Sequence, residues 1–226
     1  MKFRAVLFDA AETLFTTRGT VGEIYAGVAR RYGSIASPQE VHTAFLRHFR
    51  GSGPTAPEEQ KTWWKDAVHR VFSDVGMVDQ FDRFFDEVYN QFRDSTGWLL
   101  FPETVEVLQD LKRRGLKLGV ISNFDDRIYT VLRSLDILSF FQTVTISSET
   151  GYAKPQPEIF EAAIEALGIP AGEILLVGDS LKDDVEAGRQ IGLHAVLLDR
   201  HDHYSSANHV SRIRNLSEIT SLISEA

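Results

Sequence analysis

The sequence predicts an α/β fold, in which a doubly wound, Rossmann-like parallel sheet carries an inserted α-helical cap. From residue 101 onward, short apolar runs alternate with helical patterns. This order is typical of parallel strands joined by right-handed crossovers through helices of about 10 to 15 residues. Between residues 20 and 94, helical periodicity recurs with few strand signals, which indicates a helical segment inserted after the first strand.

The composition is that of a globular chain. Apolar residues make up 43% and charged residues 25% of the sequence, which excludes a disordered chain. The absence of Cys excludes disulfides and Cys-ligated metal centres. A net charge of −8 without a long basic run argues against a nucleic-acid partner. No apolar stretch approaches the roughly 20 residues of a membrane span, and no secretory segment follows Met1, so we expect a cytoplasmic protein that does not bind membranes.

The strands and helices of the sheet region follow from short apolar runs and amphipathic stretches. Strands are predicted at residues 4–8, 116–123, 143–147, 173–177 and 194–198, and helices at 105–114, 127–135 and 158–167. In the inserted segment, Ser37 and Pro38 have the N-cap and N1 chemistry of a helix start. Residues 51–57, rich in Gly and Pro, predict a loop. The aromatic residues that follow, with the Trp63–Trp64 pair, favour the core of a helical bundle over a substrate pocket.

Polar residues stand where the predicted strands end. Asp9, Ser122, Asn123 and Asp179 each come at the end of an apolar run. Because ligands bind beyond the carboxyl ends of parallel strands, we expect these side chains to share one site. Ser122 and the neighbouring backbone N–H groups offer a cradle for a phosphate or another oxyanion.

The acidic residues of this set predict a metal ion. Asp9, Asp179, Asp183 and Asp184 would gather at one sheet edge, where carboxylates repel one another unless they are protonated or bridged by a cation. Oxygen ligands of this kind favour Mg²⁺. Lys154, in a segment that contains two prolines, would add a fixed positive charge.

This combination resembles the haloacid dehalogenase superfamily of hydrolases over nearly the whole chain. The segments similar to its four motifs are residues 8–14, 120–123, 154–155 and 178–184. The helical segment lies where the C1 cap of this family inserts, which implies a core of residues 1–17 and 97–226 and a cap of residues 18–96. Within this superfamily the chain looks most like the subgroup related to the rhythmically expressed gene 2 product. The residues that carry this likeness are the run at 122–125, the Trp63–Trp64 pair and Tyr25.

The resemblance implies phosphoryl transfer to Asp9. Asp9 would be the nucleophile and would form an aspartyl-phosphate that water hydrolyses. Ser122 and Asn123 would bind phosphoryl oxygens, and Lys154 would neutralise their charge. The ligands of Mg²⁺ would be Asp9, the main-chain carbonyl of Ala11, Asp179 and Asp184. The implied activity is Mg²⁺-dependent hydrolysis of a small phosphorylated metabolite.

One position departs from the family pattern. The phosphatases of this family carry a second Asp two residues after the nucleophile, as general acid and base. Here that position is Ala11, and Glu12 replaces the Gly that usually follows. General acid–base catalysis contributes about 10²–10⁴-fold, so three hypotheses stay open. Glu12 substitutes for the acid, the substrate has a good leaving group such as an acyl or aryl phosphate, or the protein is a weak catalyst that binds a phospho-ligand or a partner.

Two other reactions of the family also proceed without this Asp. Dehalogenases displace halide and need no metal, whereas Asp179 and Asp184 are retained here and favour a metal site. Phosphonatase-type hydrolases form an imine with a cap lysine, for which Lys61 and Lys65 are the candidates. Lysine on an exposed helix face is nearly always only solvated. The His201-Asp202-His203 run lacks a third ligand and predicts a surface loop rather than a metal site.

Overall fold

A single parallel sheet forms the centre of the protein in a computed structural model that describes residues 3–48, 55–207 and 209–225. Its strand order is β5-β4-β1-β6-β7-β8, and every neighbouring pair is parallel. The strands are β1 (Ala5–Phe8), β4 (Lys117–Ser122), β5 (Thr143–Ile146), β6 (Ile174–Gly178), β7 (His194–Leu198) and β8 (Arg212–Ile213). The predicted doubly wound sheet is confirmed.

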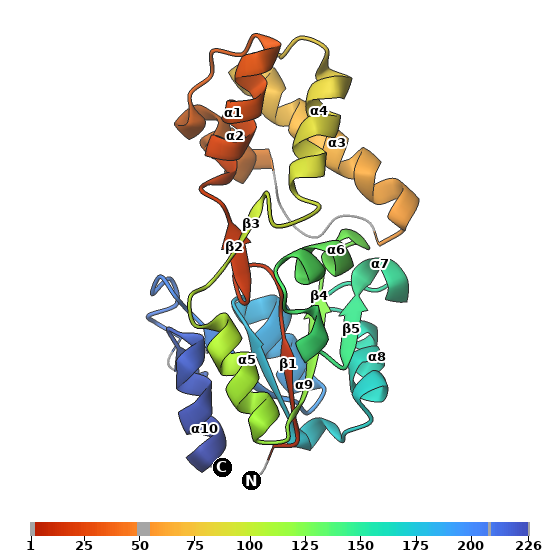
Figure 1. Ribbon diagram of the computed structural model, residues 1–226, viewed down its shortest axis with the longest axis vertical. Helices are drawn as coiled ribbons and strands as arrows, with labels where there is room; N and C mark the ends of the chain where they lie inside the picture. Colours follow the sequence, from red (N-terminus) through yellow and green to blue (C-terminus); the bar gives the residue numbers. More distant parts are fainter. Residues whose placement is uncertain (1–2, 49–54, 208, 226) are drawn as a thin grey trace.

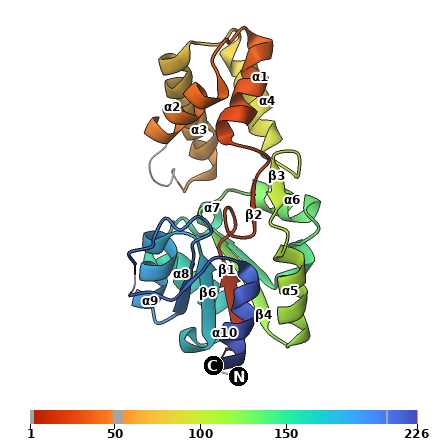
Figure 2. The ribbon, with the colours of Figure 1, turned by 90° about the vertical axis from the view of Figure 1, so that its left-hand side faces the viewer.

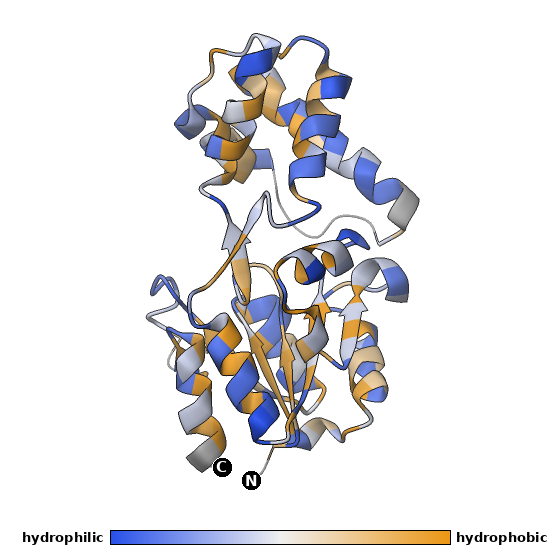
Figure 3. Cartoon of the chain, in the orientation of Figure 1, coloured by the Kyte–Doolittle hydropathy of each residue, from blue (hydrophilic) through white to orange (hydrophobic). Residues whose placement is uncertain are grey.

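Helices cover both faces of this sheet (Figures 1 and 2). One face is covered by α5 (Thr104–Arg113), α6 (Arg127–Ser134) and α10 (Ile219–Glu225), and the other by α8 (Pro157–Leu167) and α9 (Ala187–Gln190). In β1, Val6 and Phe8 join the first apolar cluster while Ala5 and Leu7 join the second, because successive side chains of a strand point to opposite faces. Figure 3 shows the resulting hydrophobic sheet between more polar outer helix surfaces.

The inserted segment, here called the cap, forms a helical unit with a core of its own. It comprises α1 (Val21–Ala29), α2 (Pro38–His48), α3 (Pro57–Val75) and α4 (Phe81–Gln91). Phe72, Phe84 and Phe85 are buried in its apolar cluster, and Trp64 packs against that cluster. The predicted helix start is present, since the Ser37 N–H donates to the Glu40 carboxylate and the Glu40 N–H donates to Ser37 Oγ. The predicted loop at 51–57 lies mostly outside the described residues.

Two short strands join the cap to the sheet region. β2 (Phe15–Thr17) and β3 (Trp98–Leu100) pair antiparallel between them (Figure 1). At three residues each, they are too short to show a period, and the sequence did not predict them. The sequence also missed β8, α10 and the short helix α7 (Ser147–Thr150), which begins where a strand was predicted to end. No helix in the described ranges is both long enough and apolar enough to cross a membrane.

Candidate functional site

The carboxyl ends of three adjacent strands bring the predicted site residues together. Asp9 follows β1, Ser122 ends β4, and Asp179 follows β6, and β1 pairs with both of the other strands. Because the strands are parallel, these residues lie at the same sheet edge. Lys154 approaches from the loop before α8, and Asp184 from a π-helical turn at Leu181–Glu186. Such turns occur frequently at functional sites.

Lys154 lies between two buried carboxylates. Its Nζ donates to Oδ1 of Asp9 and to Oδ1 of Asp184, at 2.6 Å in each case, and to the carbonyl of Ile121 at 3.3 Å. Only 4% of the Lys154 side chain is exposed. Burial acts against its charge, but Asp184 and Asp9 together raise the pKa of Lys154 above its ordinary value. Lys154 is therefore a fixed cation, as a buried charge with two charged partners should be.

Asn123 holds the main chain of Lys154. Its Nδ2 donates to the Lys154 carbonyl at 2.9 Å, and its Oδ1 accepts from the Lys154 N–H at 2.7 Å. Both ends of the amide are therefore used to position the lysine. The phosphate contact predicted for Asn123 would have to come from its main-chain N–H, next to the buried Ser122.

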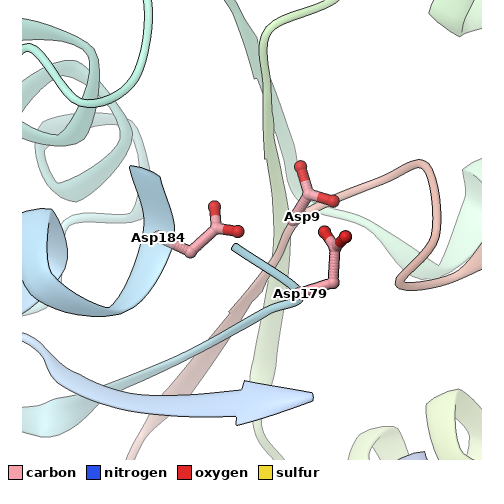
Figure 4. A group of neighbouring side chains, drawn as sticks. All are labelled: Asp9, Asp179 and Asp184. Carbon is pink, nitrogen blue, oxygen red and sulfur yellow. The ribbon is translucent and has the colours of Figure 1, made fainter. Parts of the chain in front are cut away.

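Three carboxylates form a candidate cation site. Asp9, Asp179 and Asp184 each offer an oxygen within 4.8 Å of the others, and Figure 4 shows the three side chains around a common space. Burial raises the pKa of Asp179 to about 8, with Asp9 and Asp184 adding to the rise. Burial also raises the pKa of Asp9 to about 6, while Lys154 opposes the rise and Asp184 adds to it.

These raised pKa values mean that one lysine does not compensate the negative charge of the three carboxylates. A hard divalent cation would do so, and carboxylate oxygens are the ligands that Mg²⁺ prefers. The donor set therefore fits Mg²⁺. Asp183 does not belong to this group among the described residues. Its N–H instead donates to Ser180 Oγ at 3.0 Å.

The last position of β6 requires a glycine because Asp184 packs against it. A Cβ on Gly178 would lie 2.3 Å from the carboxyl carbon of Asp184, which no side chain could tolerate. Oδ2 of Asp184 accepts from the Ser180 N–H at 3.0 Å, while Oδ1 binds Lys154. Asp184 is thus fixed at both oxygens and orients the lysine.

Ala11 and Glu12 lie in the turn between β1 and β2. Glu12 has φ 61, in the left-handed region, and its side chain is exposed. Thr16 Oγ1 donates to Glu12 Oε1 at 2.8 Å. The Glu12 carboxylate is thereby held toward β2, which disfavours the hypothesis that it replaces the missing acid.

The other sequence candidates have simpler roles. Lys61 and Lys65 each form an ion pair of 2.8 Å with a carboxylate of α4, and their side chains are 55% and 40% exposed. Asp202 pairs with two arginines of the C-terminal region. The His201-Asp202-His203 run is not part of a metal-ligand group in the described part of the chain.

Arg127, at the start of α6, contacts Tyr89 of the cap, and the sequence did not predict this contact. Asp125 precedes α6 and accepts from the Arg127 N–H at 3.1 Å, whereas Asp126 makes no side-chain cap bond. Asp125 and Arg127 also form an ion pair of 2.7 Å, with side chains 5% and 10% exposed. The Arg127 guanidinium carbon lies 3.9 Å from the ring centroid of Tyr89 on α4.

The raised pKa values predict that the metal-free protein loses stability as the pH rises. Each of these carboxyls has an ordinary pKa of 3.8 and a higher pKa in the folded protein. Its contribution to the free energy of unfolding is complete only below pH 3.8. This contribution is lost as the pH rises through the folded pKa, near 6 for Asp9 and near 8 for Asp179. We expect the free energy of unfolding to fall by up to about 1.4 kcal/mol per pH unit and per group over this range.

Urea unfolding between about pH 5.5 and pH 8, in EDTA and in Mg²⁺, checks this expectation. Because Mg²⁺ binds deprotonated carboxylates, its stabilising effect should grow with pH. The Asp179→Asn variant should flatten the dependence in EDTA. A wild-type stability that does not change with pH over this range would contradict the electrostatic account of the site.

Comparison with known proteins places these motifs in a family. Residues 3–192 match the haloacid dehalogenase-like hydrolases. Haloacid dehalogenase-like hydrolase domain-containing protein 3 of Danio rerio is 33% identical over 208 residues, which cover 88% of this chain and 86% of that protein. The Rhythmically expressed gene 2 protein of Drosophila melanogaster is 28% identical over 216 residues, covering 87% of this chain and 83% of that protein.

Solved structures with different reactions share the fold. A HAD phosphatase from Thermococcus onnurineus matches with a TM-score of 0.67 and 24% identity, covering 98% of both chains. L-2-haloacid dehalogenase from Xanthobacter autotrophicus, with chloropropionic acid covalently bound, matches with a TM-score of 0.71 and 16% identity, again covering 98% of both chains. At these identities the likeness concerns the fold alone, and the choice between reactions depends on the site residues.

Proposed function

The chain belongs to the haloacid dehalogenase-like hydrolases, as its motifs predicted, and we propose that it is a Mg²⁺-dependent phosphohydrolase with Asp9 as the nucleophile. The observation that carries this proposal is the buried group in which Lys154 binds both Asp9 and Asp184 at 2.6 Å, with Asp179 beside them. Halide displacement needs no metal ion, so a third carboxylate, Asp179, whose pKa is raised to about 8, favours phosphoryl transfer over dehalogenation.

The arrangement supports a reaction in two steps. Lys154 holds one oxygen of Asp9, and the second oxygen attacks phosphorus as the bond to the leaving group breaks. The Ser122 hydroxyl and the N–H of Asn123 would hold the phosphoryl oxygens. Water then attacks the aspartyl-phosphate, which releases phosphate and restores Asp9. Held by Asp9, Asp179, Asp184 and the carbonyl of Ala11, Mg²⁺ would neutralise charge on the phosphoryl oxygens.

The residues after Asp9 restrict the substrate. The methyl group of Ala11 cannot transfer a proton, and Glu12 is bound to Thr16. A leaving group that departs without protonation, as in an acyl or aryl phosphate, would meet this restriction. We therefore propose a small phosphorylated metabolite of that kind.

We further propose a functional division between residues 1–17 with 97–226, which carry the chemistry, and the cap at 18–96. A cap that closes over the sheet edge would exclude water from the phosphoryl group and select the substrate. Hinges near Thr16 and Thr96 would permit this movement. Thr16 lies in β2 and Thr96 shortly before β3, the strands that join the two parts.

Phosphate release from a broad panel of phosphometabolites and an aryl phosphate tests the proposal. The wild type is expected to turn over at least one compound in Mg²⁺, and to lose this activity in EDTA and in the Asp9→Asn variant. The second candidate, a weak catalyst that binds a phospho-ligand, is favoured by Ala11. It predicts thermal stabilisation by a phosphorylated compound without phosphate release. Release of halide from 2-haloacids without metal would instead indicate a dehalogenase.

A further inference from the structure

Arg127 presents hydrogen-bond donors that no described residue accepts from. Its Nε donates to both carboxylate oxygens of Asp125, at 2.8 and 2.9 Å, and its Nη2 is 2.7 Å from Oδ2 of Asp125. Within the described ranges, Nη1 makes no hydrogen bond. The side chain is only 10% exposed and is stacked on the ring of Tyr89. It is therefore a rigid guanidinium in which both N–H groups of Nη1 are unused among the described residues.

Tyr25 presents a second unused donor from the cap. Its ring is 4% exposed and packs against Phe45 and Phe92, with centroids 5.3 and 5.9 Å away. Its hydroxyl makes no hydrogen bond to any described residue. Burial raises the pKa of this hydroxyl, and the positive charge of Arg127 acts against the rise. The hydroxyl thus keeps its proton at neutral pH and lies within the field of the guanidinium.

Both groups lie where the helices of the cap meet the sheet region, since Arg127 stacks on Tyr89 of α4 and its charge acts on Tyr25 of α1. Arg127 opens α6, five positions after Ser122 in the sequence, and α6 lies beneath the cap in both ribbon views (Figures 1 and 2). Tyr25 lies on α1 and Tyr89 on α4. A substrate whose phosphoryl group rests at Asp9 and Ser122 would extend its other end toward these residues.

We propose that Arg127 and Tyr25 bind a second anionic group of the substrate, a carboxylate or a second phosphate. Arg127 has only donors to offer, and a planar guanidinium suits the oxygens of either group. The inference deepens the proposed function and depends on it, since it assigns the substrate class as small phosphate compounds with a second negative charge.

Three aryl phosphates and two variants test this assignment. The probes are phenyl phosphate, para-carboxyphenyl phosphate and hydroquinone bisphosphate, and the readout is kcat/KM for phosphate release. Tyr25→Phe removes only the hydroxyl, and Arg127→Lys keeps the charge opposite Asp125 while removing the guanidinium. The matched control is Tyr129→Phe, because the Tyr129 hydroxyl contacts Glu149 at 3.0 Å rather than the residues beneath the cap.

For the probe with the preferred second anion, kcat/KM should fall about 10- to 100-fold in Arg127→Lys and about 5- to 10-fold in Tyr25→Phe. Phenyl phosphate should change little in either variant, and no probe should respond to the control. The probe that responds more strongly identifies carboxylate or phosphate as the recognised group. Equal losses on all three probes would show a structural role and overturn the assignment, as would unchanged kinetics in Tyr25→Phe.

Failure of the proposed function is distinguishable from failure of this inference. If the wild type hydrolyses none of the probes, calorimetry with three non-hydrolysable ligands still tests the inference. Phenylphosphonate is the reference ligand, para-carboxyphenylphosphonate tests recognition of a carboxylate, and para-phenylene bisphosphonate tests recognition of a second phosphate. The wild type should bind one of the two ligands that carry a second anionic group at least about 10-fold more tightly than phenylphosphonate, and Tyr25→Phe should reduce that preference. Equal affinities for all three ligands would contradict the inference.

Discussion

Replacing Lys154 by methionine is expected to lower turnover strongly and to destabilise the fold. The substitution leaves Asp9 and Asp184 buried, at 6% and 1% exposure, without the cation that each binds at 2.6 Å. Removing one partner of a buried ion pair costs about 3–5 kcal/mol in the free energy of unfolding. Loss of one preorganised cation at a reacting group should lower kcat by roughly 10²–10³-fold.

Urea unfolding in EDTA near neutral pH and phosphate release in Mg²⁺ measure the two effects of Lys154→Met. Lys117 provides the matched control, since its Nζ donates to a single main-chain carbonyl, that of Leu167, at 3.0 Å. Lys117→Met should cost about 1 kcal/mol and leave turnover unchanged. If Lys154→Met is as stable and as active as this control, Lys154 does not have the role assigned to it.

Replacing Ala11 by aspartate is expected to extend activity to substrates with poor leaving groups. A carboxyl two positions after the nucleophile would supply the missing proton transfer, which is worth about 10²–10⁴-fold. The gain should appear in kcat/KM for alkyl phosphates and be small for aryl phosphates, whose leaving groups need little protonation. A comparison of one alkyl and one aryl phosphate in both proteins measures it.

Ala11→Asn is the control for this gain. It has nearly the shape of aspartate but does not act as a general acid, so it should leave the wild-type preference for aryl phosphates in place. Equal rates for Ala11→Asp and the wild type on alkyl phosphates would show that another group already donates the proton. A similar gain in Ala11→Asn would indicate a change in packing rather than in proton transfer.

The parallel sheet was predictable because its main strands are short apolar runs that end in polar residues. The run at 4–8 is one such case, and the strand is observed at Ala5–Phe8. Convergence of Asp9, Ser122 and Asp179 follows from that topology alone, since parallel strands share a carboxyl edge. The strands β2 and β3 were not predictable, because three residues show no periodicity.

Contacts between segments distant in the sequence mark the limit of prediction. The acidic residues alone left both Asp183 and Asp184 as candidates, and the family resemblance favoured Asp184. The turn at Leu181–Glu186 brings Asp184 to Lys154. The sequence predicted a phosphate contact for Asn123, whose side chain is taken up by the main chain of Lys154. The stacking of Arg127 on Tyr89 depends on how the cap sits above α6, and no local pattern encodes it.

Identification of the covalent intermediate tests the central claim most directly. The wild type would be quenched during turnover of phenyl phosphate in Mg²⁺ and digested, and the peptides weighed by mass spectrometry. The account predicts the added mass of one phosphoryl group on the peptide that contains Asp9, and no such mass in EDTA or in Asp9→Asn. Continued phosphate release by Asp9→Asn, or a phosphoryl group on another residue, would contradict the assignment of Asp9 as the nucleophile.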